Sequence, residues 1–250
     1  MSPPLDHHPS SSGKSGGLRL LDAAWQEAVA ALKANLLPGL ILQAIMAGMA
    51  LAYLFHPSSR SAFEELAILR SRWGLLFSFI GTSLASSIFP EFLRLLLPKT
   101  AQKNALGLRA RLLFGIPFWG LIGMQVDLFY RLQYFLFGPS ETIPIIAQKV
   151  LVDAFVYCPL LAMPQAVCAF IWRDHGFSFQ GFHGHRPLPF YALKVFPVLM
   201  ANWMVWIPLV CIIYSLPPAL GIPFFIVAQS FWVMVFSTLA MKKQRPRTTD

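Results

Sequence analysis

Long apolar runs alternate with short polar segments along the chain. Six runs are long enough to cross a hydrocarbon core of roughly 30 Å, which takes about 20 mostly apolar helical residues. They span residues 36–55, 74–97, 112–137, 143–172, 190–216 and 220–241. Because a backbone in lipid must satisfy its own hydrogen bonds, each run is predicted to form a helix. The pattern therefore predicts an all-α fold, a polytopic transmembrane helical bundle over residues 36–241.

Prolines inside the apolar runs affect the shape expected of these helices. Each proline removes one backbone hydrogen bond and favours a kink. A bundle tolerates this where neighbouring helices or waters satisfy the freed carbonyl group. The prolines are Pro117, Pro159, Pro164, Pro197, Pro208 and Pro223. The predicted bundle is therefore one of about six kinked helices.

The segments before and after the apolar runs differ in composition. Residues 1–17 are rich in proline, serine and glycine and are predicted to be a disordered tail without the apolar core of a signal peptide. Residues 18–35 form an amphipathic pattern, which predicts either an interfacial helix or an extension of the first apolar helix. Residues 242–250 form a short basic tail.

Composition strengthens the membrane interpretation. Apolar residues make up 56% of the 250 residues, charged residues make up 12%, and the mean hydropathy is +0.58. Soluble domains average about 25% charged residues. These values argue against both a soluble globular protein and a disordered one.

The positive charge follows the loops. The formal net charge is +9, and 15 of the 20 Lys and Arg residues lie on one side if both termini share that side. The positive-inside rule then predicts six spans with both termini cytoplasmic. The expected partners are the lipid bilayer and anionic lipids at the basic loops. Nucleic acid is not expected, since the basic residues do not form one patch.

Three carboxylates interrupt the apolar runs, and each has a basic residue at helical spacing. The pairs are Glu91 with Arg94, Asp127 with Arg131, and Lys149 with Asp153. Residues three or four apart meet on one helix face, so ion pairs are predicted. A charge in the bilayer costs at least about 2.5–3.5 kcal/mol, which pairing reduces. Three interpretations stay open: structural ion pairs, a polar path for a solute, and an interfacial position.

Uncharged polar and aromatic side chains also recur within the runs. Ser78, Thr82 and Ser86 form one hydroxyl-bearing face, which favours close helix packing, with a wet cavity as the alternative. Trp203 and Trp206 lie within a run, where we expect packing between helices. Asn202 is the most polar position there after the carboxylates.

No arrangement of reactive side chains predicts catalysis. Cys158, Cys168 and Cys211 lie in apolar runs without a CxxC pattern, and His183 and His185 lack an evident fourth ligand. We therefore expect no enzyme, no metal site and no cofactor.

Several motifs over residues 74–245 occur in the order and spacing of a known family. They are Phe129-Tyr130-Arg131, Lys149 with Asp153 and Pro159, Pro197, Asn202-Trp203 with Trp206, Tyr214 with Pro218, and Trp232 with Ser237. In these residues the chain resembles the Mpv-seventeen / PMP-twenty-two family of integral membrane proteins. It departs from the family pattern at Ala154, Ile207, Val210, Ile213 and Ile222 and is therefore similar to a divergent member.

The resemblance implies channel-like permeation without catalysis, and a polar role for Asp153 with Lys149. The added first apolar run and tail favour a bacterial cytoplasmic membrane, with the mitochondrial inner or peroxisomal membrane as alternatives. Two functional hypotheses follow. The first is a protein that forms or modulates a small-solute or ion pore lined or braced by Asp127 and Asp153. The second is a structural or partner-binding membrane protein, and a homo-oligomer is compatible with either.

Overall fold

The computed structural model describes residues 12–95, 107–139, 141–184 and 186–243, and these residues form an all-α structure. The helices, in chain order, are α1 (Ser12–Phe55), α2 (Pro57–Trp73), α3 (Leu75–Ser83), η1 (Leu84–Ile88), α4 (Phe89–Leu95), α5 (Leu108–Phe137), α6 (Ile143–Val152), η3 (Asp153–Ala162), α7 (Met163–Asp174), η4 (Phe179–Phe182), α8 (Pro187–Phe190), η5 (Tyr191–Val195), α9 (Phe196–Tyr214), η6 (Pro218–Leu220) and α10 (Gly221–Lys243). The predicted fold class is confirmed.

Five helical stretches in the described part are long and apolar enough to cross a membrane. They are Gly17–Phe55, Leu75–Phe92, Leu108–Phe137, Ile143–Asp174 and Pro187–Tyr214. The sixth predicted run coincides with η6 and α10, within which Pro218–Trp232 is apolar. By fold, the chain is a multi-pass membrane protein.

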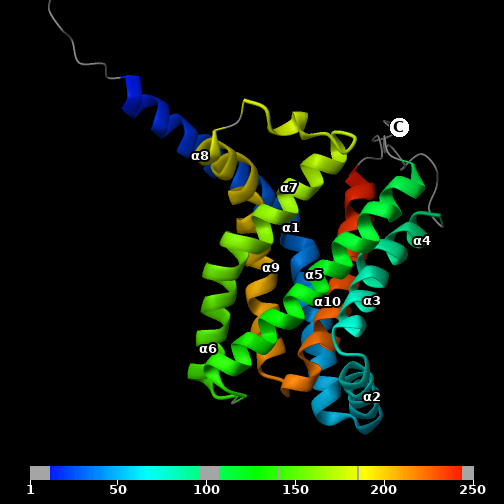
Figure 1. Cartoon of the computed structure of the whole chain (residues 1–250). Helices are drawn as coiled ribbons and strands as arrows, with labels where there is room; N and C mark the ends of the chain where they lie inside the picture. Colours follow the sequence, from blue (N-terminus) through cyan, green and yellow to red (C-terminus); the bar gives the residue numbers. More distant parts are fainter. Residues whose placement is uncertain (1–11, 96–106, 140, 185, 244–250) are drawn as a thin grey trace, which may run out of the picture.

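The long helices run alternately up and down, so the connections gather at two ends of the bundle (Figure 1). One end carries α2 and the α5–α6 and α9–α10 connections, and we refer to it as the α2 end. The opposite end carries the start of α1, the α7–α8 connection and the last described turn of α10. The start of the first described helix and the end of the last one therefore lie at the same end of the bundle.

The first helix begins earlier than predicted, and of the two alternatives for residues 18–35 the structure shows the extension of the first span. Helix α1 is continuous from Ser12, so residues 12–17 are helical and the predicted amphipathic segment extends the first span. Adding residues to an existing helix requires no new nucleation, which favours such an extension. Residues 1–11 of the predicted tail and 244–250 of the basic tail lie outside the described residues.

Helix α2 is the element that sequence analysis missed. It begins with Pro57 in its first turn and ends at Gly74, whose φ of +56° is readily accessible to glycine. The Gly74 N–H donates to the Arg70 carbonyl at 2.8 Å and closes the last turn. None of its residues is buried, so α2 lacks the apolar run that identified the other helices.

Three π-helical segments accompany prolines in the spans. Segment η1 comes just before Pro90, η3 contains Pro159 and comes just before Pro164, and η5 ends two residues before Pro197. A proline cannot donate to the preceding turn and its ring crowds the carbonyl four residues back, which the wider π turn relieves. Pro223 lies in the first turn of α10, where no helical hydrogen bond is lost, so a kink predicted there has no cause.

Helices α3 and α5 pack closely through small residues. Thr82 and Ser83 donate side-chain hydrogen bonds of 2.8 Å to the carbonyls of Trp119 and Ile116. A Cβ on Gly123 would lie 2.6 Å from the Ser78 carbonyl oxygen, so the backbones approach each other where glycine allows it. The packing interpretation of this hydroxyl face is confirmed at Thr82.

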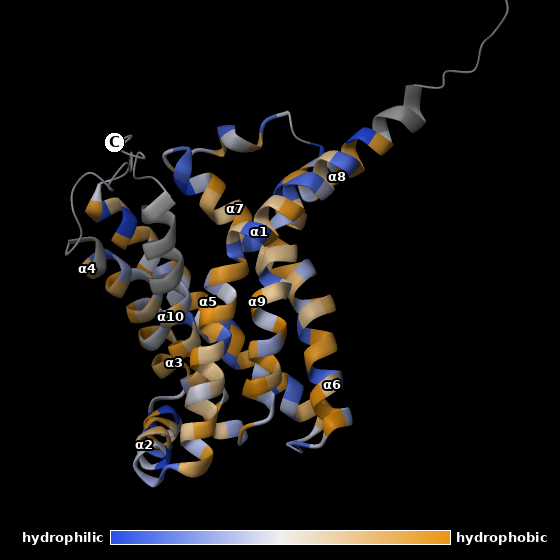
Figure 2. Ribbon diagram, turned by 180° about the vertical axis from the view of Figure 1, so that it is seen from behind, coloured by the Kyte–Doolittle hydropathy of each residue, from blue (hydrophilic) through white to orange (hydrophobic). Residues whose placement is uncertain are grey.

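The core forms where α1, α5, α9 and α10 meet. It includes Leu42, Met46, Val126, Val205, Leu209, Ile213 and Phe224, all at most 6% exposed. In contrast, many large apolar side chains are exposed, and hydrophobic residues occur along the long helices of the bundle (Figure 2). Phe135 and Leu113 are 85% and 77% exposed. An apolar perimeter of this kind matches a lipid environment rather than water.

Candidate functional site

Three ionisable side chains are buried in the half of the bundle toward the α2 end. Asp127 of α5 and Lys149 of α6 are 0% exposed, and Asp153 at the start of η3 is 7% exposed. Ionisable groups inside a transmembrane bundle are expensive and mark functional positions by default. Their partners therefore decide which of them are structural.

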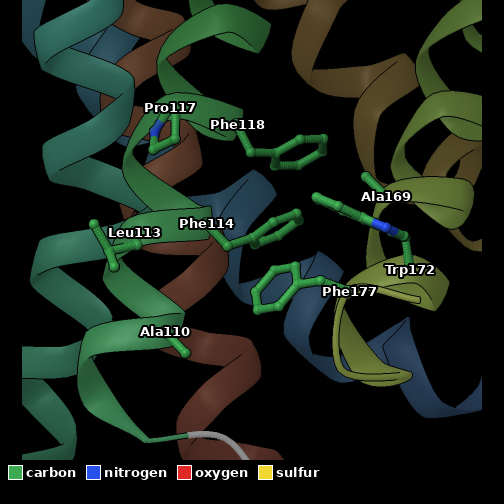
Figure 3. A pocket seen from close by; sticks show the side chains of 8 residues that line it. All are labelled: Ala110, Leu113, Phe114, Pro117, Phe118, Ala169, Trp172 and Phe177. Atoms are coloured by element: carbon green, nitrogen blue, oxygen red, sulfur yellow. The ribbon is translucent and has the colours of Figure 1, made fainter.

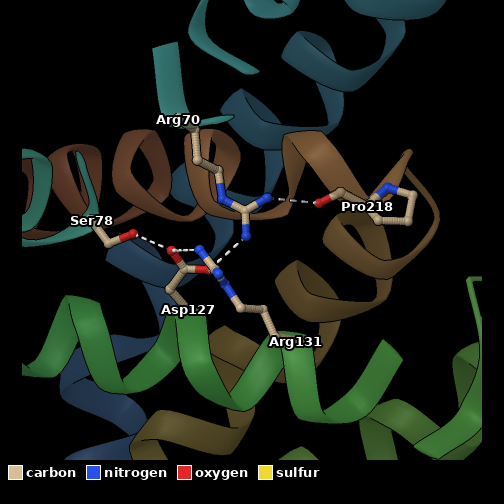
Figure 4. A network of polar contacts seen from close by, with 5 residues as sticks. All are labelled: Arg70, Ser78, Asp127, Arg131 and Pro218. Atoms are coloured by element: carbon tan, nitrogen blue, oxygen red, sulfur yellow. Dashed lines mark hydrogen bonds and ion pairs between the residues drawn. The ribbon is translucent and has the colours of Figure 1, made fainter. Parts of the chain in front are cut away.

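Asp127 is held by three donors from three helices (Figure 4). Arg70 of α2 donates through Nη2 to Oδ1 at 2.5 Å, and Arg131, one turn along α5, donates through Nε to Oδ1 at 3.0 Å. Ser78 of α3 donates its hydroxyl to Oδ2 at 2.6 Å. Both carboxylate oxygens accept hydrogen bonds, so Asp127 connects α2 and α3 to α5.

The predicted pair of Asp127 and Arg131 is present, but the more buried partner was missed. The Arg70 side chain is 14% exposed, whereas that of Arg131 is 50% exposed. The composition of residues 57–73, which contain no apolar run, is typical of a loop. A signal was available in Pro57 and Gly74, which bound the polar segment in the order typical of a helix.

The predicted ion pair between Lys149 and Asp153 is wrong. The Lys149 Nζ is buried without a hydrogen-bond partner and lies 4.2 Å from the centre of the Tyr134 ring on α5. Asp153 accepts instead from the Tyr214 hydroxyl of α9, at 2.9 Å, and from the Cys158 thiol at 3.5 Å. Spacing along one helix allowed the pair, but partners on α5 and α9 draw the two side chains apart.

Of the remaining predicted site residues, Asn202 and Trp203 contact η3 and Trp206 contacts α10. The Trp203 indole N–H donates to the Ala154 carbonyl inside η3 at 2.7 Å, and Asn202 donates to the Cys158 sulfur at 3.5 Å. Trp206 packs against Phe225 of α10 with ring centres 5.6 Å apart. The predicted role of these tryptophans in helix packing is confirmed.

Gln133 of α5 connects the surroundings of Lys149 and Asp153. Its Nε2 donates to the Lys149 carbonyl at 2.9 Å and to the Tyr214 hydroxyl oxygen at 3.3 Å. Its Oε1 is buried and unpartnered, as are the Arg70 Nε and the Tyr134 hydroxyl. The α2 end therefore contains Asp127, whose two carboxylate oxygens both accept hydrogen bonds, and several buried polar groups without a hydrogen-bond partner.

Glu91 of α4 is paired across helices near the opposite end of the bundle. Arg111 of α5 approaches it in a bidentate manner, with Nε–Oε1 and Nη2–Oε2 distances of 2.8 and 2.7 Å. The predicted partner was Arg94, whose side chain lies outside those described. The bidentate geometry explains why an arginine on the neighbouring helix is a strong partner.

An apolar pocket of about 460 Å³ lies between α5 and α7 at that same end (Figure 3). It is lined by Ala110, Leu113, Phe114, Pro117, Phe118, Ala169, Trp172 and Phe177. The Arg173 guanidinium lies 5.5 Å from the Phe114 ring centre. The lining is apolar and does not include the buried ionisable residues.

The fold and the buried charges define a class, that of polytopic α-helical membrane proteins with ionisable groups inside the bundle. No protein-family model, no characterised protein and no solved structure matches the chain. The resemblance to the Mpv-seventeen / PMP-twenty-two family stays a prediction.

Proposed function

We propose that the protein forms or modulates a pore for small solutes or ions, and that Lys149 and Asp153 contact the permeating species. The observation that supports this proposal is that both side chains are buried in a transmembrane bundle and neither forms an ion pair. The two residues lie one turn apart on a single span, where α6 passes into η3.

The energetics distinguish these residues from Asp127. A buried charge without a partner carries a desolvation penalty of several kcal/mol, which a counter-ion offsets only in good geometry. Asp127 has two arginines and a hydroxyl in such geometry. The side chains in direct contact with Lys149 and Asp153 are the neutral Tyr134, Tyr214 and Cys158. A functional role therefore explains the two buried charges better than a contribution to stability does.

The other predicted residues then take supporting roles. Arg70 and Arg131 hold Asp127, and through it they position α5 against α2 and α3. Asn202 and Trp203 bind the wide turns of η3 and so orient Asp153. The family resemblance agrees with this assignment, because the positions matching Lys149 and Asp153 are polar in that family.

The location is part of the proposal. A bacterial cytoplasmic membrane is favoured, with both termini on the cytoplasmic side and anionic lipids at the basic loops. In this orientation the α2 end, with its buried charges, faces away from the cytoplasm.

Conductance across a planar bilayer tests the proposal. Purified wild-type protein is expected to give discrete openings, and Asp153→Asn is expected to change their amplitude. Glu65→Gln, which neutralises an exposed carboxylate of α2, is the matched control and should behave as wild type. A silent bilayer with folded, inserted wild-type protein would contradict the pore.

The second candidate function is a structural or partner-binding membrane protein without transport. The three hydrogen bonds to Asp127 favour this second function, because they use both carboxylate oxygens to connect α5 with α2 and α3. Under this function, Asp153→Asn lowers the yield or the melting temperature, and no flux is present to change.

A further inference from the structure

Three buried hydrogen-bond donors around Tyr134 have no acceptor. They are the Nε of Arg70, the hydroxyl of Tyr134 and the Nζ of Lys149. Leaving a buried donor unsatisfied costs about 1–3 kcal/mol, and more when the group is charged. Three such donors from three helices would be stabilised by an acceptor placed between them.

The contacts of these groups bring them to one place. The Lys149 Nζ lies over the Tyr134 ring at 4.2 Å from its centre. The Arg70 Nη1 reaches the Pro218 carbonyl of η6 at 3.5 Å. The Tyr134 hydroxyl lies 3.6 Å from where a Cβ on Gly221 would stand, three residues after Pro218. The charge of Arg70 also acts on Tyr134, so the donors from α2, α5 and α6 lie in one neighbourhood beside the η6 turn.

The nearby carboxylates either accept hydrogen bonds from other groups or are exposed. Asp127 accepts from Arg70, Arg131 and Ser78, and Asp153 accepts from Tyr214 and Cys158. Glu141 influences both Lys149 and Tyr134 electrostatically, but it is exposed at the α2 end and leaves the Lys149 Nζ unbonded. Gln133 Oε1 and the Tyr134 hydroxyl oxygen could also accept hydrogen bonds, but neither is bonded to the Lys149 Nζ or the Arg70 Nε.

We infer that Arg70, Tyr134 and Lys149 form a binding site for a small monovalent anion. An anion supplies acceptor positions without adding donors, and its charge offsets that of the Lys149 ammonium. A cation is repelled by Lys149 and Arg70, while water satisfies hydrogen bonds without balancing the charge. This inference rests on the proposed function in one respect, because it names anions as the permeating solutes. Anion binding at this site does not itself require transport.

Chloride binding to the purified full-length protein in detergent tests the site. The broadening of the ³⁵Cl NMR line by the protein is measured against competing chloride concentrations. Wild-type protein is expected to show a saturable component that Lys149→Met reduces by about tenfold or more in affinity, since one charged hydrogen bond is worth about 1.5–3 kcal/mol. Lys194→Met removes an exposed lysine and is the matched control, with unchanged binding expected.

Tyr134→Phe is the second variant, because Lys149→Met can affect folding. It retains the ring under the ammonium and removes only the hydroxyl donor, so about a three- to tenfold weaker affinity is expected. A saturable component equal in the wild type, Lys149→Met and Tyr134→Phe would overturn the inference. Wild-type protein without a saturable component would overturn it too, and would indicate water at the three donors.

The result separates this inference from the proposed pore. Saturable chloride binding in a protein that gives no conductance supports the site and contradicts the pore. Conductance that is unaffected by anion identity, without saturable binding, supports the pore and contradicts the site.

Discussion

The carboxylates Glu91, Asp127 and Asp153 each have at least one partner on another helix. Asp127 has two arginines and a serine, Glu91 has an arginine from α5, and Asp153 has a tyrosine and a thiol. Sequence spacing found the pair of Asp127 and Arg131 because both residues lie on one helix face. It missed Arg70 and Arg111 because a partnership between helices leaves no trace in local spacing.

Arg70 is expected to matter more than Arg131 for stability. Arg70→Gln leaves the fully buried Asp127 dependent on a half-exposed partner, so the free energy of unfolding should fall by about 2–4 kcal/mol. Arg131→Gln removes the partly solvated partner and should cost about 1 kcal/mol or less. Thermal unfolding of both variants in detergent measures the difference, and equal losses would contradict the assigned roles.

At the scale of elements, apolar length predicted the spans and proline content pointed to irregular turns within them. Apolar length could not predict α2, because a polar helix without buried residues has the composition of a loop, and only the flanking Pro57 and Gly74 indicate it. It also could not predict that the wide turns would fall at η1, η3 and η5, since these depend on how neighbouring helices satisfy the freed carbonyls. The Trp203 N–H on the Ala154 carbonyl is one such contact.

The α3–α5 interface gives a test at this scale. Gly123→Ala places a methyl group 2.6 Å from the Ser78 carbonyl oxygen, and the overpacking should lower the free energy of unfolding by about 1–3 kcal/mol. Gly48→Ala on α1 is the matched control, because nothing lies within 4 Å of its added carbon. The control should be neutral or stabilising by about 0.5–1 kcal/mol. Melting temperatures in detergent measure both, and a tolerated Gly123→Ala would contradict the close packing.

At the scale of the molecule, the alternating helices place α2 and the α7–α8 connection at opposite ends of the bundle (Figure 1). Five helical stretches of the described residues are long and apolar enough to cross a bilayer, and many of their large apolar side chains are exposed. Which end faces the cytoplasm follows from the basic residues alone and is a prediction of the positive-inside rule.

Labelling of single cysteines tests both the span and its direction. In a background without the three natural cysteines, Ser59→Cys of α2 should react with an impermeant maleimide added outside intact cells. Ser178→Cys, in the α7–α8 connection, should react only after permeabilisation. Reaction of both cysteines from the same side would contradict a bundle that crosses the membrane.

The central claim is that Lys149 and Asp153 contact the permeating solute, and the reversal potential in a salt gradient tests it most directly. Removing the carboxylate in Asp153→Asn should shift the reversal potential toward that of the anion. Removing the ammonium in Lys149→Met should shift it toward that of the cation, because fixed charges on a path select ions of opposite sign. Glu65→Gln should leave it unchanged. Reversal potentials that stay equal in all four proteins, each folded and conducting, would contradict the claim.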